Sequence, residues 1–190
     1  MIRVAECSRE TKETRIKVKL TLDGTGKSTI HTGFKFLDHM LTLLSTHSLI
    51  DIELEASGDL THHVMEDVGI TLGACLNKAL GDKKGINRYG FAFIPMDDAL
   101  ARCVLDFSGR KALILDLNLN ECNIEDVAVE DVIHFFNSFA EHAKMNLHLH
   151  VLYGEDQHHK VEAAFKALAR AIKEAIKIVS QDIPSSKGTL

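Results

Sequence analysis

Apolar and polar positions alternate along the first part of the chain and then give way to helical spacing. Over residues 14–22 every second residue is apolar: Ile16, Val18, Leu20 and Leu22. This alternation predicts a half-buried strand, and the turn at 23–26 predicts a hairpin with a returning strand at 28–32. The same pattern predicts strands at 49–56, 91–96, 99–107, 112–117 and 146–152. Apolar residues at helical spacing predict helices at 36–46, 61–80, 127–143 and 157–180.

The order of these elements repeats within the chain. The helix at 36–46 matches 133–143 and the strand at 49–55 matches 146–152, at an offset near 97. We expect an α+β fold made of a duplicated half-domain, with two antiparallel four-stranded sheets flanking a four-helix layer. The expected parts are a first half-repeat at 1–85, a second at 86–181 and a polar tail at 182–190. The two halves are expected to pack as one globular unit.

Composition narrows the class of protein. The chain has 190 residues, of which 45% are hydrophobic and 26% charged, and this is typical of a water-soluble globular protein. The net charge of -5 gives no reason to expect nucleic-acid binding. No apolar run of 18 residues predicts a membrane span, and residues 1–10 lack the apolar core of a signal peptide. The four cysteines form no CxxC pair, so we expect reduced thiols in a cytoplasmic protein.

Two histidine pairs are the strongest sign of chemistry. His62-His63 and His158-His159 lie 96 positions apart, and a glutamate follows the first histidine of each pair by four residues. On a helix, residues i and i+4 lie nearly above one another, so each first histidine can bind one cation together with its glutamate. Imidazole and carboxylate suit first-row ions such as Mn, Fe, Co, Ni or Zn. The alternative is a solvated helix start, which the second copy makes the weaker interpretation.

The second histidine of each pair points elsewhere. His63 and His159 are turned about 100° from the preceding histidines on the helix, so they are expected to point towards a second metal or a partner chain. His39, near the start of a helix, and His148, on a strand, are each more often hydrogen-bonded structural residues than ligands. Scattered cations near glycine-rich turns are candidates for phosphate capture; they are Arg88, Arg110, Lys166 and Lys187.

The chain resembles the imidazoleglycerol-phosphate dehydratase family over nearly its whole length. The matching segments are 9–14, 36–41, 62–67, 87–90, 95–97, 108–110, 134–136, 147–148, 158–162, 165–167 and 185–188. Their number and order make the resemblance specific. One departure is a loop before His62 that is about three residues shorter than the family's usual pattern.

The resemblance implies a metal-dependent dehydratase that converts imidazole glycerol phosphate to imidazole acetol phosphate in histidine biosynthesis. It implies two Mn²⁺ ions per active site, acting as Lewis acids and templates. It also implies trimers that assemble into a 24-subunit shell, with ligands from neighbouring subunits. The implied metal ligands are His39, His62, His63, Glu66, His148, His158, His159 and Glu162. The implied catalytic residues are Glu13, Glu162, Asp97 and Lys166. The implied phosphate and substrate contacts are Glu13, Arg88, Arg110, Lys166, Ser185 and Lys187.

Two other kinds of protein remain alternatives at this stage. A non-catalytic metal-binding shell would need the histidine-glutamate pairs but neither Arg88 nor Arg110 nor the Ser185–Lys187 tail. A two-metal hydrolase would bind phosphate, but such sites are usually dominated by carboxylates, whereas imidazoles dominate here. The dehydratase accounts for both sets of residues.

Overall fold

The computed structural model describes residues 2–120 and 122–190. The first sheet has the strand order β1-β2-β4-β3. Its strands are β1 (Val4–Glu10), β2 (Thr14–Thr21), β3 (Ser28–His31) and β4 (Asp51–Gly58). β1, β2 and β4 are antiparallel neighbours, whereas β3 runs parallel to β4. One face of this sheet is buried, because the alternating Ile16, Val18 and Leu20 of β2 all point inward.

The second sheet repeats this topology with the order β5-β6-β10-β7. Its strands are β5 (Tyr89–Met96), β6 (Ala99–Asp106), β7 (Ala112–Asp116) and β10 (Asn146–Tyr153). β7 runs parallel to β10, as β3 does to β4. β8 (Asn123–Ile124) and β9 (Val127–Ala128) form a short hairpin that is a separate two-stranded sheet.

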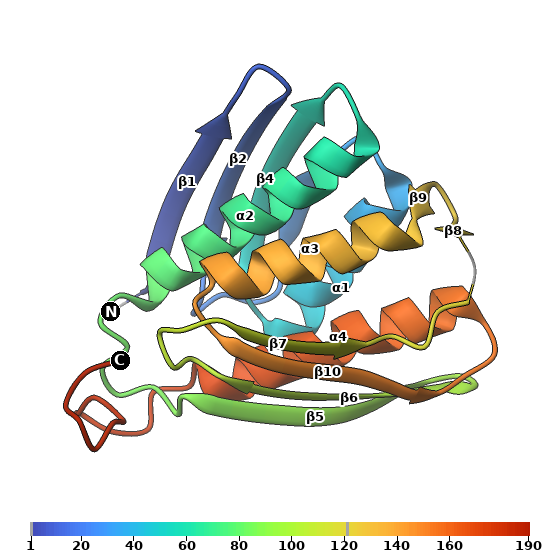
Figure 1. Cartoon of the computed structure of the whole chain (residues 1–190). Coiled ribbons are helices and arrows are strands. Elements are labelled where there is room, and N and C mark those ends of the chain that lie inside the picture. The colour runs from blue at the N-terminus through green and yellow to red at the C-terminus, as the bar shows by residue number, and fades with distance from the viewer. Residues whose placement is uncertain (1, 121) are drawn as a thin grey trace.

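Four helices fill the space between the two sheets (Figure 1). They are α1 (Lys35–Ser48), α2 (Thr61–Leu80), α3 (Val129–His142) and α4 (Gln157–Ala175). α2 packs on β1 and β2, and α4 packs on β5 and β6. One hydrophobic core runs through both halves of the chain. None of the described helices is long and apolar enough to cross a membrane.

The four helices run in the same direction, so all four begin at one end of the molecule (Figure 1). Gly69 of α2 lies against the carbonyl of Phe135, and Gly73, one turn later, lies against that of Phe139 on α3. The starts of α1 and α4 are held by carboxylates, Asp126 and Asp156, which suit the positive end of a helix dipole. Asp126 accepts hydrogen bonds from the backbone of Lys35 and Phe36 at 2.7 and 3.0 Å.

The expected α+β fold with two four-stranded sheets and four helices is confirmed, but each sheet is mixed rather than purely antiparallel. The predicted hairpin partner of β2 at 28–32 is also wrong. β3 lies on the far side of β4, because α1 connects the two as a crossover, and a crossover is the connection that parallel neighbours require. α3 and the β8–β9 hairpin connect β7 to β10 in the same way.

One boundary and one strand also differ from expectation. The helix predicted to reach residue 180 ends at Ala175, and Ile178 instead pairs with Ile86 in an isolated bridge. β1 was absent from the prediction, although it forms the outer edge of the first sheet. The expected boundary at 81–85 falls between α2 and β5, where Gly81 and Gly85 have positive φ angles of 59° and 75°.

Candidate metal centre

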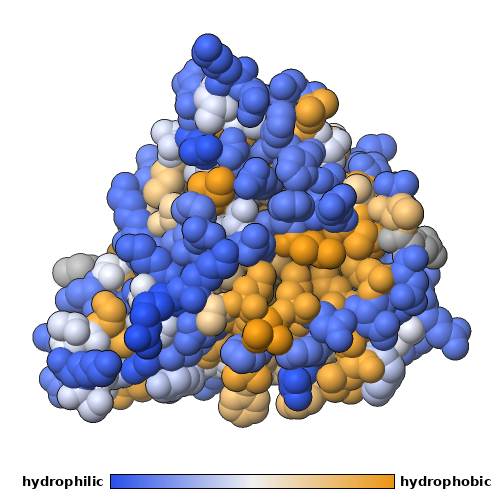
Figure 2. All heavy atoms as spheres, in the orientation of Figure 1, coloured by the Kyte–Doolittle hydropathy of each residue, from blue (hydrophilic) through white to orange (hydrophobic). Residues whose placement is uncertain are grey.

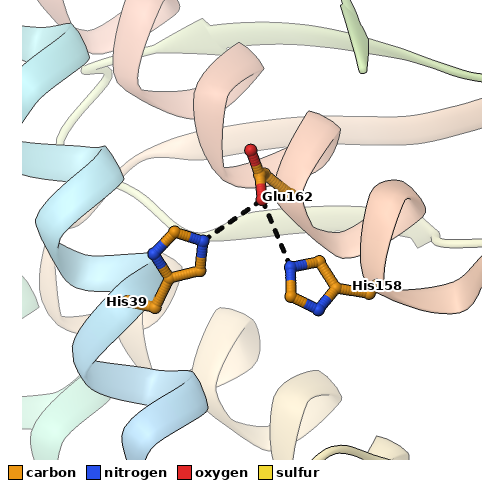
Figure 3. A group of neighbouring side chains, drawn as sticks. All are labelled: His39, His158 and Glu162. Atoms are coloured by element: carbon orange, nitrogen blue, oxygen red, sulfur yellow. Dashed lines mark hydrogen bonds and ion pairs between the residues drawn. The ribbon is translucent and has the colours of Figure 1, made fainter. Parts of the chain in front are cut away.

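Three potential metal ligands converge where α1 and α4 begin. Oε2 of Glu162 lies 3.2 Å from Nε2 of His39 and 3.3 Å from Nε2 of His158 (Figure 3). One ligand atom from each of the three residues lies within 4.8 Å of the others. The predicted i, i+4 pair on α4 is therefore in place, and His39 joins it from the facing helix. Two imidazoles and a carboxylate are a fitting donor set for a first-row metal ion.

Glu162 is held between these histidines and a cation. Its other oxygen, Oε1, lies 2.5 Å from Nζ of Lys166, one turn further along α4. Burial would raise the pKa of the Glu162 carboxyl, but the hydrogen bonds from Lys166 and His39 outweigh it and hold that pKa below its usual value. The carboxylate is thus buried and ionised, with one oxygen directed at the imidazoles.

A corresponding histidine cluster lies where α2 and α3 begin. The ring of His62 lies 4.6 Å from that of His134, edge to face. His134 follows His39 by 95 positions, and His158 follows His62 by 96, so the duplication relates the two clusters. Nδ1 of His62 also lies 2.8 Å from the carboxylate of Asp131. Glu66 stands one turn after His62 on α2, as Glu162 does after His158.

His134 is the functional candidate that the sequence interpretation missed. It lies between apolar residues in Ile133-His134-Phe135-Phe136, which looks like the edge of a helix core. The signal that could have found it is the 96-residue spacing of the two histidine pairs, which places the counterpart of His39 within one residue of His134. Of the described residues, only His39, His158 and Glu162 form a group of three close donors; Glu66 does not complete such a group with His62 and His134.

The second histidine of each pair lies beside a strand-to-strand turn in the sheet formed by the same half of the chain. Nδ1 of His63 lies 2.8 Å from Asp59 and 3.8 Å from Glu13 in the β1–β2 turn. His159 lies in the corresponding place beside the β5–β6 turn. Its Nδ1 is 2.6 Å from Asp98 and its Nε2 is 3.5 Å from Asp97. Two predicted carboxylates, Glu13 and Asp97, therefore occupy equivalent positions.

These contacts favour the protonated form of both histidines. The hydrogen bond with Asp59 raises the pKa of His63, and that with Asp98 raises the pKa of His159. Asp98 also accepts hydrogen bonds from the backbone of Glu155 and Asp156, and these bonds together with His159 hold its pKa well below the usual value.

The predicted phosphate contacts lie at the opposite end of α4. The backbone N–H of Arg88 donates to the carbonyl of Ala175, the last residue of that helix. Seventeen residues separate Ala175 from His158 along α4, which at 1.5 Å per residue is about 26 Å. Gly109, next to Arg110, lies against the backbone of Leu190 in the tail. Lys166 is the one predicted phosphate cation near the histidines.

The guanidinium of Arg88 already has hydrogen-bond partners within the chain. Its Nε and Nη2 donate to the two oxygens of Asp106 at 2.6 and 3.0 Å, and its Nη1 donates to the carbonyl of Pro184 at 2.8 Å. The guanidinium thus links β6 to the tail that carries Ser185 and Lys187. The tail folds back on itself, because the backbone N–H of Lys187 donates to Oγ of Ser185 at 3.2 Å.

His148 lies away from the histidine clusters. It is exposed on β10, between buried Leu147 and Leu149, so it faces outward from the second sheet whereas the clusters belong to the helices. Its neighbours across the sheet are Val104 on β6 and Ile114 on β7. The structure does not bring His148 together with the other predicted ligands of the same chain.

A duplicated α+β fold with histidine-carboxylate clusters at its helix starts has the donor set of a metal-dependent enzyme. The family model described as imidazoleglycerol-phosphate dehydratase matches residues 32–172. The chain belongs to this family, and its enzyme class, a hydro-lyase of histidine biosynthesis, agrees with the prediction. The non-catalytic shell is not supported.

Individual relatives are similar over nearly the whole chain. The enzyme named imidazoleglycerol-phosphate dehydratase from Chloroherpeton thalassium is 51% identical, with 99% of this chain and 98% of the relative covered. The enzyme of the same name from Methanothermobacter thermautotrophicus is 50% identical, with 96% of this chain and 95% of the relative covered. The crystal structure of imidazoleglycerol-phosphate dehydratase from Staphylococcus aureus has a TM-score of 0.85 and 37% identity, with 93% of this chain and 99% of that chain covered. The crystal structure of the Pyrococcus furiosus protein in complex with (S)-C348 has a TM-score of 0.80 and 36% identity, with 96% of this chain and 99% of that chain covered.

Proposed function

We propose that this chain dehydrates imidazole glycerol phosphate to imidazole acetol phosphate with two Mn²⁺ ions per active site. The observation that carries the proposal is the convergence of His39, His158 and Glu162, with His62 and His134 in the corresponding place on α2 and α3. Imidazole and carboxylate donors suit Mn²⁺, although they also suit neighbouring first-row ions. Bound at these residues, the ions would act as Lewis acids and as a template for the substrate.

The ligand set follows the duplication. We assign His39, His158 and Glu162 to one half-site, the α1–α4 half-site, and His62, His134 and Glu66 to the other, the α2–α3 half-site. His63 and His159 lie at the outer ends of these half-sites, where they can bind an ion held mainly by another copy. In this assignment His134 replaces His148, because His134 contacts His62 whereas His148 lies on the outer face of the second sheet.

Proton transfer is assigned to residues beside these half-sites. Loss of water removes a hydrogen from carbon and a hydroxyl group, so the site needs a proton acceptor and a proton donor. Glu13 is exposed and lies beside His63, so it can reach a substrate as an acceptor, and Asp97 lies in the same position beside His159. Lys166 is assigned as the donor, and its contact with Glu162 favours the ionised form of that carboxylate.

The substrate phosphate is assigned to the opposite end of the chain. Arg110 and Lys187 are exposed there, and Ser185 adds a hydroxyl. Such a set of guanidinium, ammonium and hydroxyl groups suits phosphate. Arg88 is bound to Asp106 and Pro184, so its contribution would be to place the tail that carries Ser185 and Lys187.

The separation of the two ends requires more than one copy. The half-sites and the phosphate end are about 26 Å apart along α4, which is too far for one small phosphorylated imidazole to touch both. We therefore propose that the active site is completed by neighbouring copies, in trimers that assemble into a 24-subunit shell.

The surface of the second half supports this assembly. One row across the outer face of the second sheet contains Phe91, Val104, His148 and Ile114. Phe91 is 68% exposed and Ile114 is 51% exposed, which is unusual for large apolar side chains that remain in water. A further apolar region lies between α3 and the edge strand β7 (Figure 2). It includes a groove of about 670 Å³ lined by Leu113, Leu115 and Ile133.

The proposed compartment is the cytoplasm. The four cysteines are free thiols, and Cys103 is fully buried. Unpaired cysteines are typical of a reducing compartment, where disulfides rarely persist.

The test is turnover of imidazole glycerol phosphate by metal-stripped protein, followed by the absorbance of the enolised product. Activity that returns with Mn²⁺ and not with Mg²⁺ is the expected result, because Mg²⁺ prefers oxygen ligands. Full activity in the stripped protein, with residual metal excluded by elemental analysis, would overturn the metal dependence.

A further inference from the structure

The two half-sites differ at one equivalent position, one helical turn before the central histidine. On α1 this position is Phe36, three residues before His39, and on α3 it is Asp131, three residues before His134. Each contacts the first histidine of the facing pair. Phe36 meets the ring of His158 edge-on, with the centroids 5.2 Å apart, whereas Asp131 lies 2.8 Å from Nδ1 of His62.

Asp131 is built to hold His62 in one orientation. Its side chain is only 10% exposed, although an aspartate is rarely buried without a partner. It lies in the first turn of α3, where the helix dipole favours a negative charge. An ionised carboxylate only accepts hydrogen bonds, so in the neutral ring of His62 this contact places the proton on Nδ1 and leaves the lone pair on Nε2. That is the tautomer a metal ion needs at Nε2.

Among the residues that the structure describes, the other half-site offers its histidine no comparable support. Nδ1 of His158 lies 3.1 Å from Glu125, but the side chain of Glu125 is 58% exposed and belongs to the turn between β8 and β9. An exposed carboxylate on a turn exchanges readily with water and restrains the ring weakly. His158 is restrained instead by Phe36 and by Glu162, which lies 3.3 Å from its Nε2.

We propose that Asp131 is a positioning residue that sets the metal affinity of the α2–α3 half-site independently of the α1–α4 half-site. This inference rests on the proposed function, because it assumes that His62 binds a metal ion. Carboxylates that orient a ligating histidine typically change metal affinity by about 10–100-fold. The two ions of one active site are then bound by different means, one through a buried aspartate behind the histidine and one through the histidine-glutamate pair itself.

The experiment is a Mn²⁺ titration of the metal-stripped full-length protein, followed by electron paramagnetic resonance of free Mn²⁺ and by calorimetry. The variants are Asp131→Leu, which keeps the branched shape without an acceptor, and Asp131→Asn, which keeps a neutral acceptor. Glu125→Gln is the matched control at the other half-site. Thermal unfolding and size are checked for each variant before titration.

In the wild type we expect two classes of bound Mn²⁺. Asp131→Leu should weaken one class by about 10–100-fold and leave the other unchanged, and Asp131→Asn should restore part of the loss. Glu125→Gln should leave the class affected by Asp131→Leu unchanged. A folding defect alone would weaken both classes and would not be relieved by asparagine.

Three results would overturn either the role of Asp131 or the proposed metal-dependent function. If Asp131→Leu and Asp131→Asn both bind Mn²⁺ like the wild type, or weaken both classes equally, Asp131 does not position His62. If Glu125→Gln weakens the same class as Asp131→Leu, the half-sites are not independent. A wild type that binds no Mn²⁺ contradicts the proposed function itself, which is a different failure from either of these.

Discussion

The two histidine clusters, both at the starts of helices, offer similar imidazoles on the same scaffold, with different neighbours. In the α1–α4 half-site, Glu162 lies between His39 and His158 and is paired with Lys166. In the α2–α3 half-site, His62 and His134 contact each other directly, and Asp131 lies behind His62. Duplication has kept the positions of the proposed ligands while the residues beside them have diverged. In our proposal the scaffold fixes where the metals would bind, and these neighbouring residues set the affinity.

The outer faces of the two sheets differ even more. A row across the first sheet contains Glu6, Lys19, Glu53 and Thr29, with Lys19 and Glu53 in a 2.7 Å ion pair. The equivalent face of the second sheet carries Phe91, Val104 and Ile114. Both sheets bury the other face against helices. The difference teaches that one sheet is suited to water and the other to contact with further protein.

The largest expected effect is at the α1–α4 half-site. Glu162→Gln removes a proposed ligand and the partner of Lys166, so we expect kcat to fall by about 10²–10⁴-fold. The measurement is steady-state turnover with saturating Mn²⁺. Glu174→Gln, near the far end of α4, is the matched control and should keep wild-type kcat. Near-normal turnover of Glu162→Gln would remove this half-site from the account.

The next effect is on assembly. Replacing Phe91 and Ile114 together by glutamate places charge on the apolar face, and each buried side chain of this size contributes about 1.5–3 kcal/mol. We expect light scattering to show a smaller particle with each chain still folded. Lys19→Gln on the charged sheet should leave the particle mass unchanged. A full-sized particle in the double variant would show that the second sheet is not an interface.

The third effect concerns how closely the helices of each half-site approach. α2 contacts α3 through Gly69 and Gly73, whereas neither α1 nor α4 contains glycine. In Gly73→Ala the new Cβ would lie 2.5 Å from the carbonyl oxygen of Phe139, which is backbone and cannot rotate away. We expect a loss of about 1–3 kcal/mol in the free energy of unfolding.

Chemical denaturation measures this loss, and Asn77→Ala on the same helix is the control. That change should stay within about 0.5 kcal/mol. Unchanged or increased stability of Gly73→Ala would mean that α2 and α3 are not in the close contact described.

The smallest effect is the pH dependence of a link between the two halves. The Arg3 guanidinium holds the pKa of Asp23 below its usual value, against a smaller opposing effect of burial, and Arg3 also donates to the carbonyl of Ile176 after α4. Because the folded pKa is depressed, this stabilisation is present above the ordinary aspartate pKa of about 3.9 and is lost as the pH falls through the lower folded value.

Arg3→Gln should therefore be less stable than the wild type at pH 6, by about 1 kcal/mol or less for so exposed a pair. The difference should shrink towards pH 3. Unfolding midpoints measured across this range provide the test, and a difference that grows as the pH falls would contradict the assigned pair.

Local patterns explain which elements could be predicted from the sequence. The helix at 61–80 was predicted with its observed bounds, because its apolar spacing is regular and Gly81 ends it. The last helix was predicted too long, because Ile178 and Val179 continue the apolar pattern although they pair with the chain near Gly85. The neighbour of β3 cannot be predicted locally, because its parallel pairing with β4 depends on a crossover that no short pattern records.

The site shows the same division. The pairing of His158 with Glu162 follows from helix geometry, so it could be predicted. The contact of His62 with His134 depends on how α2 packs against α3, and the position of Arg88 at the far end of α4 depends on the direction of the helices. Long-range placement of this kind is set by tertiary packing, which residue spacing does not encode.

The most direct test of the central claim, an active site shared between copies, is complementation between two inactive variants. Glu162→Gln removes the metal end and Arg110→Ala removes the phosphate end. If each site takes these ends from different copies, co-expressed hetero-oligomers should recover activity in about a quarter of their sites. If both ends of a site belonged to one chain, every site in the mixture would carry one defect or the other. Activity no higher than that of the separate variants, in confirmed hetero-oligomers, would contradict the account.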